Sequence, residues 1–216
     1  MQWPTFKINS WRDFQDFAYD FTSGSLIFPD FYFRGQSGSL QLEPSLIRLL
    51  KAGISAKDAL YIEYESIIEF KSLAPLFIQS KFMPDREMGK LFWLPVMQHY
   101  GAPTRLLDWT TSPFVASYFA VKDLPENDGV VWFYNWKKLR EKISQKDSNY
   151  LNRANWIPDN SFRNDAPSYL VDFPPSIQTD RMVVQQSNFT MSINILGNHE
   201  KIINKFLEDP KEKASH

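Results

Sequence analysis

The chain has 216 residues, of which 43% are hydrophobic and 16% aromatic, and its 24 basic and 25 acidic residues give a formal net charge of -1. This content suffices for a sizeable buried core, which excludes a chain that is disordered throughout, and the balanced charge provides no overall field toward nucleic acid or an anionic membrane. The absence of cysteine excludes disulfides, thiolate nucleophiles and zinc-thiolate sites.

No apolar run has the length of a membrane span, and the first residues, MQWPTFKINSWRDF, do not have the pattern of a signal peptide. We therefore expect a soluble, cytoplasmic protein. The three histidines, His99, His199 and His216, do not occur at metal-ligand spacing, so we expect no transition-metal site.

Helical patterns dominate the N-terminal half. Behind Ser10, a candidate N-cap, aromatic residues recur at helical spacing as far as Phe21 and predict a buried stripe. Ser55 begins a longer pattern that Pro75 ends or kinks, and its many glutamates indicate a solvated face. Further helices are predicted from about residue 44, over roughly residues 87–100 and from residue 113.

Strand patterns dominate the C-terminal half. They occur at residues 31–34, 129–135, within 168–173 and, as one or two strands, within 181–195. Short helices are predicted over 136–145 and after residue 199, with a long loop over most of 150–175 and a flexible tail at 209–216. We expect a single α+β domain over residues 1–216, with helices packed on a mixed or antiparallel sheet.

The stretch YFRGQ places Arg34 at the end of an apolar strand, beside Gly35. A glycine here permits close approach of another backbone or of a ligand. The planar guanidinium matches a phosphate or a carboxylate, so Arg34 either binds an anionic ligand or belongs to an internal ion pair.

The stretch TRLLDWTTSP places further polar groups between apolar segments. Asp108 could accept hydrogen bonds from Arg105, three residues away, or from Arg34, and it is a candidate positioning group. The hydroxyls of Thr110, Thr111 and Ser112 either donate to a ligand or cap the following helix, and Ser112 favours the capping role.

Three aromatic rings flank this stretch. His99 lies near a predicted helix C-terminus and is either an acid or base or a structural histidine. Trp109 and Tyr100 could stack on a planar ligand or belong to the core. Further along, Gln185 and Gln186 end an apolar strand on opposite faces, so one of them is predicted to face a core network or a ligand.

On these motifs the chain resembles the FRG-domain family, named for its Phe-Arg-Gly motif and widespread in bacteria and their phages. The matching blocks, in the family's order, are FRGQ at 33–36, residues 99–120, the strand at 129–133, and QQS at 185–187 with Phe189. This resemblance covers most of the chain but implies no particular activity.

A more distant similarity relates the same order of motifs to ADP-ribosyltransferases, which use NAD as a co-substrate. It implies that Arg34 contacts NAD, that Thr110, Thr111 and Ser112 line the nicotinamide side, and that Gln185 or Gln186 occupies the catalytic position. Because a glutamine supplies a dipole where those enzymes have a glutamate, chemistry through Asp108 or His99 is an alternative.

We therefore expect a ligand-binding or catalytic domain of a bacterial or phage toxin or defence system, with NAD or a related nucleotide as its ligand and a protein as a further candidate partner. The alternative is a non-catalytic module that binds nucleotides, nucleic acid or protein. In that case Arg34 and Arg105 would hold phosphate, while Trp109 or Tyr100 stacks on a base.

Overall fold

The computed structural model describes residues 4–22, 30–38, 41–50, 53–85, 89–124, 126–150, 163, 165–173, 184–208 and 213–215. The α-helices are α1 (Trp11–Thr22), α2 (Ser45–Leu49), α3 (Ala56–Leu73), α4 (Leu94–His99), α5 (Pro113–Val121), α6 (Trp136–Lys146) and α9 (His199–Phe206). The 3-10 helices are η1 (Ala74–Leu76), η2 (Ser80–Phe82) and η3 (Lys90–Trp93). The strands are β1 (Phe31–Ser37), β2 (Leu106–Thr110), β3 (Gly129–Asn135), β4 (Leu170–Phe173), β5 (Ser187–Ser192) and β6 (Lys213–Ser215).

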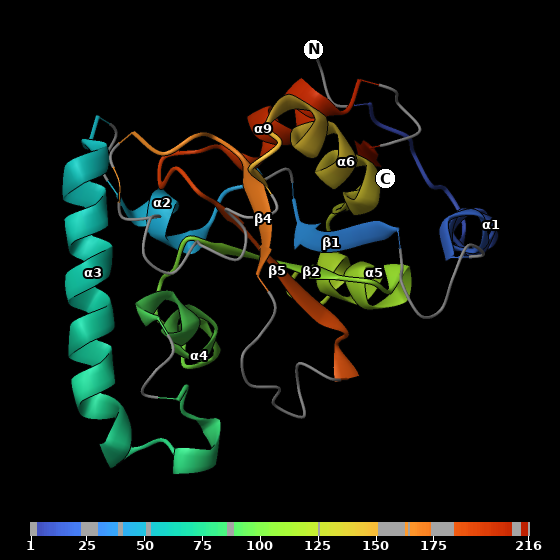
Figure 1. The fold of residues 1–216 in the computed structure, drawn as a ribbon. Coiled ribbons are helices and arrows are strands. Elements are labelled where there is room, and N and C mark those ends of the chain that lie inside the picture. The colour runs from blue at the N-terminus through green and yellow to red at the C-terminus, as the bar shows by residue number, and fades with distance from the viewer. Residues whose placement is uncertain are drawn as a thin grey trace.

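The strands in these ranges form one sheet in the order β4-β5-β2-β1-β3-β6, and every neighbouring pair is antiparallel. The expected α+β class is confirmed, with an antiparallel sheet. Figure 1 shows α3 along one side of the molecule and α1 at the opposite side, with the sheet between them. None of the described helices combines the length and the apolar composition of a membrane span.

The two faces of the sheet are covered by different helices. On one face, α1 and α5 pack on Phe33, Val131 and Phe133. On the other, α6 and α9 contribute to the larger core, which also contains Tyr32 and Tyr134. Alternate residues of β1 and β3 thus point to two apolar layers, as expected for strands that are covered on both sides.

Two helix starts agree with their predicted caps. The Ser10 hydroxyl accepts a hydrogen bond from the Asp13 N–H (3.1 Å), and the Ser55 hydroxyl accepts one from the Asp58 N–H (3.1 Å). The helix α3 ends at Leu73, shortly before Pro75. These helices therefore begin where local side-chain chemistry satisfies free N–H groups.

The helix predicted over roughly residues 87–100 is divided into η3 and the shorter α4. Pro95 lies in the first turn of α4, where a missing N–H breaks no hydrogen bond. Gly101 follows with a φ of +84°, which confirms it as the C-terminal stop. Residues 86–88 lie outside the described residues, as do residues 151–162 of the predicted loop.

Two segments differ from the sequence predictions. Residues 106–110, to which the sequence patterns assigned neither a helix nor a strand, form the strand β2. Within the predicted tail at 209–216, Lys213–Ser215 form β6 and pair with β3. In both cases the backbone hydrogen bonds come from strands that are far away in the sequence, so local spacing does not reveal them.

Candidate functional site

The sheet is incomplete between β1 and β2. These strands share a single register pair, Phe33 with Thr110, whereas β1 pairs with β3 along all seven of its residues. A cavity of about 500 Å³ lies where β1 and β2 diverge. Its lining residues are Phe33, Arg34, Gly35, Gln36, Ser37, Arg48, Pro95, Gln98, His99, Asp108, Trp109, Thr110, Val115, Phe119, Lys122, Asp123, Gln185, Ser187 and Phe189.

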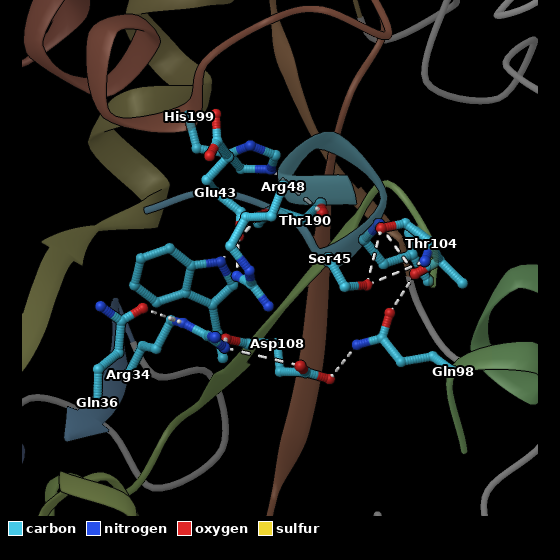
Figure 2. Close-up of polar contacts among 12 residues, drawn as sticks. Arg34, Gln36, Glu43, Ser45, Arg48, Gln98, Thr104, Asp108, Thr190 and His199 are labelled. Carbon is cyan, nitrogen blue, oxygen red and sulfur yellow. Dashed lines mark hydrogen bonds and ion pairs between the residues drawn. The ribbon is translucent and has the colours of Figure 1, made fainter. Parts of the chain in front are cut away.

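Arg34 spans this gap with its side chain (Figure 2). Its Nε–H donates to Gln36 Oε1 (3.1 Å), and its Nη1 donates to the backbone carbonyl of Asp108 (2.8 Å). Nη1 also lies 3.6 Å from Asp108 Oδ2, and the side chain is only 19% exposed. The guanidinium therefore takes the place of a strand-to-strand backbone hydrogen bond that β1 does not make.

Burial lowers the pKa of Arg34; Asp108 opposes this effect and Arg48 adds to it. An arginine nevertheless stays protonated in a protein, so the charge is retained in a poorly solvated place. Such a charge calls for compensation by an anion. Asp108 supplies only part of it, because its carboxylate is 53% exposed.

Arg48, on α2, is a second cation at the same cavity. Its Nη1 donates to the carbonyl of Glu43 (2.5 Å), and among the described residues no carboxylate lies within ion-pair distance of it. Sequence reasoning missed Arg48, since a basic residue in a short helix has no local feature that marks it as a ligand contact.

Asp108 is held from the side opposite Arg34. Its Oδ1 accepts a hydrogen bond from Gln98 Nε2 (2.6 Å), and Gln98 Oε1 accepts one from the Thr104 hydroxyl. Thr104 in turn exchanges hydrogen bonds with the Ser45 hydroxyl at the start of α2, as Figure 2 shows. The carboxylate is thus fixed by a chain of hydrogen bonds, which passes through the Thr104 hydroxyl and backbone and ends on the helix carrying Arg48.

Arg105, predicted as a ligand-binding residue and a partner of Asp108, has neither role in this structure. It is 1% exposed and pairs with Glu63 on α3, through Nε–H to Oε1 (2.7 Å) and through Nη2 to Oε2. Because residues three apart on a strand point to opposite faces, Arg105 and Asp108 separate. The prediction that the α3 glutamates are solvated is wrong for Glu63, which is 2% exposed.

Gly35 provides a close approach, but to a helix and not to a ligand. A Cβ atom at this position would lie 1.8 Å from the carbonyl oxygen of Ala116 and 2.6 Å from the backbone nitrogen of Ala120. The glycine therefore lets β1 lie directly on α5. This contact brings Val115 and Phe119, also on α5, to the wall of the cavity.

The three hydroxyl residues after Asp108 have separate roles. Thr110 donates to the carbonyl of Gln185 (2.8 Å), and Thr111 donates to Gln186 Oε1 (2.8 Å). Ser112 caps α5 by accepting from the Val115 N–H (3.3 Å), which confirms its capping role. Of these three residues only Thr110 lines the cavity.

The two glutamines lie in the turn before β5 and not on a strand, so the prediction that they occupy opposite strand faces is wrong. Gln186 has a φ of +48°, and its side chain is bound by Thr111 at an exposed position. Gln185 is half-buried and lines the cavity. The turn thus places Gln185 at the cavity and Gln186 outside its lining, a difference that the sequence did not indicate.

The three aromatic candidates also differ in position. Trp109 lines the cavity but is 2% exposed, and its Nε1–H donates to the Thr190 hydroxyl (2.7 Å), which identifies it mainly as a core residue. Tyr100 packs on Phe77 (ring centroids 5.6 Å apart) and does not line the cavity. His99 is exposed and lines the cavity rim.

Gln36 and Gln98 are the other polar residues that sequence reasoning missed. Gln36 lies two residues after Arg34 on β1 and hence on the same face, which is a signal that could have found it. Gln98 meets Asp108 only through tertiary packing of α4 on β2, so no local pattern marks it.

Residues 29–129 match the family model of the FRG domain. The FRG domain match runs from just before β1 to the first residue of β3 and includes Arg34, Arg48, Gln98 and Asp108 of the cavity. Gln185 lies outside the matched FRG domain residues. No curated protein and no solved structure matches the chain.

Proposed function

We propose that the cleft between β1 and β2 binds the phosphate groups of a nucleotide, with NAD as the first candidate, through Arg34 and Arg48. The proposal rests on the two guanidinium groups, which have more N–H donors than the hydrogen bonds of the described residues use. Arg34 uses Nε and Nη1, and Arg48 uses Nη1, in the hydrogen bonds of the described residues. The remaining donors of two neighbouring arginines suit the several oxygens of a phosphate group.

The charges around the cavity favour an anionic ligand. Lys122 is already paired with Asp123 (2.9 Å), and Arg34 lies 3.6 Å from the half-exposed Asp108 carboxylate. Arg48 then adds a positive charge that no carboxylate of the described residues neutralises. A phosphate between Arg34 and Arg48 would relieve the repulsion between the two guanidinium groups.

The remainder of the cavity suits an organic substituent on that phosphate. Phe33, Val115 and Phe119 provide an apolar wall, and a volume of about 500 Å³ lies within the usual range for small-molecule sites. A nucleotide combines a charged phosphate with a planar ring, so it matches both parts. Inorganic phosphate would use only the charged part.

ADP-ribosyl transfer is a second candidate, favoured by the Asp108 carboxylate in the same cavity. Transfer from NAD passes through a cationic sugar, which a carboxylate stabilises better than an amide dipole. Gln185 lies at the cavity, but its amide is neutral. If transfer occurs, we assign the stabilising charge to Asp108 and a polar contact to Gln185. A role of the protein in a bacterial or phage toxin or defence system is part of this proposal.

Binding is tested by titration calorimetry with NAD and with adenosine, which has no phosphate. We expect NAD to bind and adenosine to bind at least tenfold more weakly, because hydrogen bonds between charged groups contribute strongly. Arg48→Gln should weaken NAD binding about tenfold, whereas Arg12→Gln, on α1 and away from the cleft, should not change it. Equal binding of adenosine and NAD, or no binding of NAD, would overturn the proposal.

Transfer is tested separately with NAD labelled in its nicotinamide ring. Release of nicotinamide by the wild type and its loss in Asp108→Asn, with NAD still bound, would support the transferase candidate. Binding without release would leave a nucleotide-binding module. Tighter binding of a single-stranded oligonucleotide than of NAD, weakened steeply by salt, would instead support the nucleic-acid alternative.

A further inference from the structure

The Asp108 carboxylate has accepting capacity that the protein does not use. An ionised carboxylate offers about four lone-pair positions on its two oxygens. Gln98 donates to Oδ1, and Arg34 lies near Oδ2, and these are the side-chain partners of the carboxylate among the described residues. Because the group is 53% exposed and lines the cavity, the remaining positions are open to a ligand.

A carboxylate beside an anion site would repel the ligand unless the ligand also presents hydrogen-bond donors. Such donors must lie near the phosphate, since Asp108 Oδ2 is only 3.6 Å from Arg34 Nη1. The vicinal hydroxyl groups of a ribose meet this requirement, because they are neutral donors on the sugar that carries the phosphate. A carboxylate that accepts from sugar hydroxyls is a recurrent solution in nucleotide sites.

We propose that Asp108 accepts hydrogen bonds from the ribose hydroxyls of the bound nucleotide and that Gln98 is the positioning residue that holds the carboxylate for them. This inference rests on the proposed nucleotide-binding function and deepens it. It limits the ligands to ribonucleotides with free vicinal hydroxyls.

The contacts of Gln98 support its positioning role. One hydrogen bond from its amide fixes Asp108 Oδ1 (2.6 Å), and the Thr104 hydroxyl fixes the orientation of that amide. Without Gln98 the carboxylate could rotate toward Arg34 and form a paired contact with it. That rotation would remove both the hydroxyl acceptor and a free cation from the cleft.

The test compares AMP with 2′,3′-dideoxy-AMP by titration calorimetry. For the wild type we expect AMP to bind about tenfold more tightly, because the dideoxy compound leaves the Asp108 acceptors unpaired. Asp108→Asn should abolish this preference and bind inorganic pyrophosphate more tightly, since it removes a negative charge. Asp165→Asn, which alters an exposed arginine-paired aspartate outside the cavity, should retain the preference.

Equal binding of AMP and dideoxy-AMP to the wild type would overturn this inference alone, and binding of neither would overturn the proposed function with it. Gln98→Met distinguishes a role of Gln98 in positioning the Asp108 carboxylate from a role in stabilising the fold. We expect it to lower the affinity for AMP by a clearly larger factor than that for dideoxy-AMP, because both compounds lose the free cation but only AMP also loses the hydroxyl acceptor. An equal loss for both compounds would show that Gln98 only supports the fold.

Discussion

Glu63 and Arg105 form an ion pair in which both side chains are almost completely buried, at 2% and 1% exposure. The pair joins α3 to the residue before β2, and Arg105 Nη1 also donates to the carbonyl of Ile193 (3.3 Å), just after β5. It therefore connects helix and sheet on the side of the molecule where α3 lies (Figure 1).

Removing one partner of this pair should destabilise the fold severely. We expect Glu63→Leu or Arg105→Met to lower the free energy of unfolding by about 3–5 kcal/mol, because each leaves a buried charged group without its partner. The double variant Glu63→Leu with Arg105→Met should recover much of this loss. Urea unfolding of all four proteins measures it, and additive losses would contradict the coupling.

Two buried groups should give stability opposite dependences on pH. Burial raises the pKa of Asp172, whose Oδ2 accepts from the Tyr32 hydroxyl (3.2 Å), from 3.8 to about 6. Between these values the folded state binds more protons than the unfolded state, so stability falls as pH rises. Burial lowers the pKa of His199 from 6.5 to about 4, so here the unfolded state binds more protons and stability rises with pH.

Each of these effects amounts to about 3 kcal/mol over its interval, and in the wild type they should largely cancel between pH 4 and 6. In Asp172→Asn only the effect of His199 remains, so we expect its stability to increase from pH 4 to 6. In His199→Gln only the effect of Asp172 remains, so we expect its stability to decrease over the same range. Thermal unfolding at several pH values in this range checks both, and parallel curves for the two variants would count against the assignment.

Gly35→Ala should separate β1 from α5. Because the new Cβ would meet backbone atoms of Ala116 and Ala120, no side-chain rotation can relieve the contact. We expect a loss of at least 2–3 kcal/mol of unfolding free energy. As a control, Gly53→Ala changes a glycine with open space around its Cβ position, and its smaller effect should come from a φ of +85° alone. Equal losses in the two variants would refute the steric explanation.

Arg34→Lys distinguishes a binding role from a purely structural one. Lysine keeps the charge but cannot donate to Gln36 and Asp108 in the forked geometry of the guanidinium. We expect a folded protein, less stable by about 1–2 kcal/mol, whose affinity for NAD falls more than tenfold. Complete unfolding, seen by circular dichroism at 25 °C, would instead favour a purely structural role for Arg34.

The sequence predicted those helices and strands that are marked by a few neighbouring residues. Ser10, Ser55 and Ser112 mark helix starts because their hydroxyls satisfy nearby N–H groups. The strand β3 is also found, since its apolar run is uninterrupted. The strand β2 was missed because its five residues carry an aspartate at the centre and its neighbours are distant strands.

The candidate site was predicted in part for the same reason. Arg34 and Asp108 were singled out because charged residues interrupt apolar segments, and both line the cavity. Gln98, which donates to Asp108, and Arg48, which lines the same cavity, come from other elements and leave no mark in the local sequence. Arg105 looked equally suitable until Glu63, 42 positions earlier, neutralised it in the interior.

The pairing order of the sheet also determines when it can form. β1, at residues 31–37, pairs fully only with β3, at residues 129–135, and β2 requires β5, which ends at Ser192. A chain that emerges from the ribosome therefore presents α1, β1 and α3 long before their partners exist. We expect slow folding from such distant pairings, and this delay makes the nascent N-terminal half a natural client for chaperones that shield apolar strands.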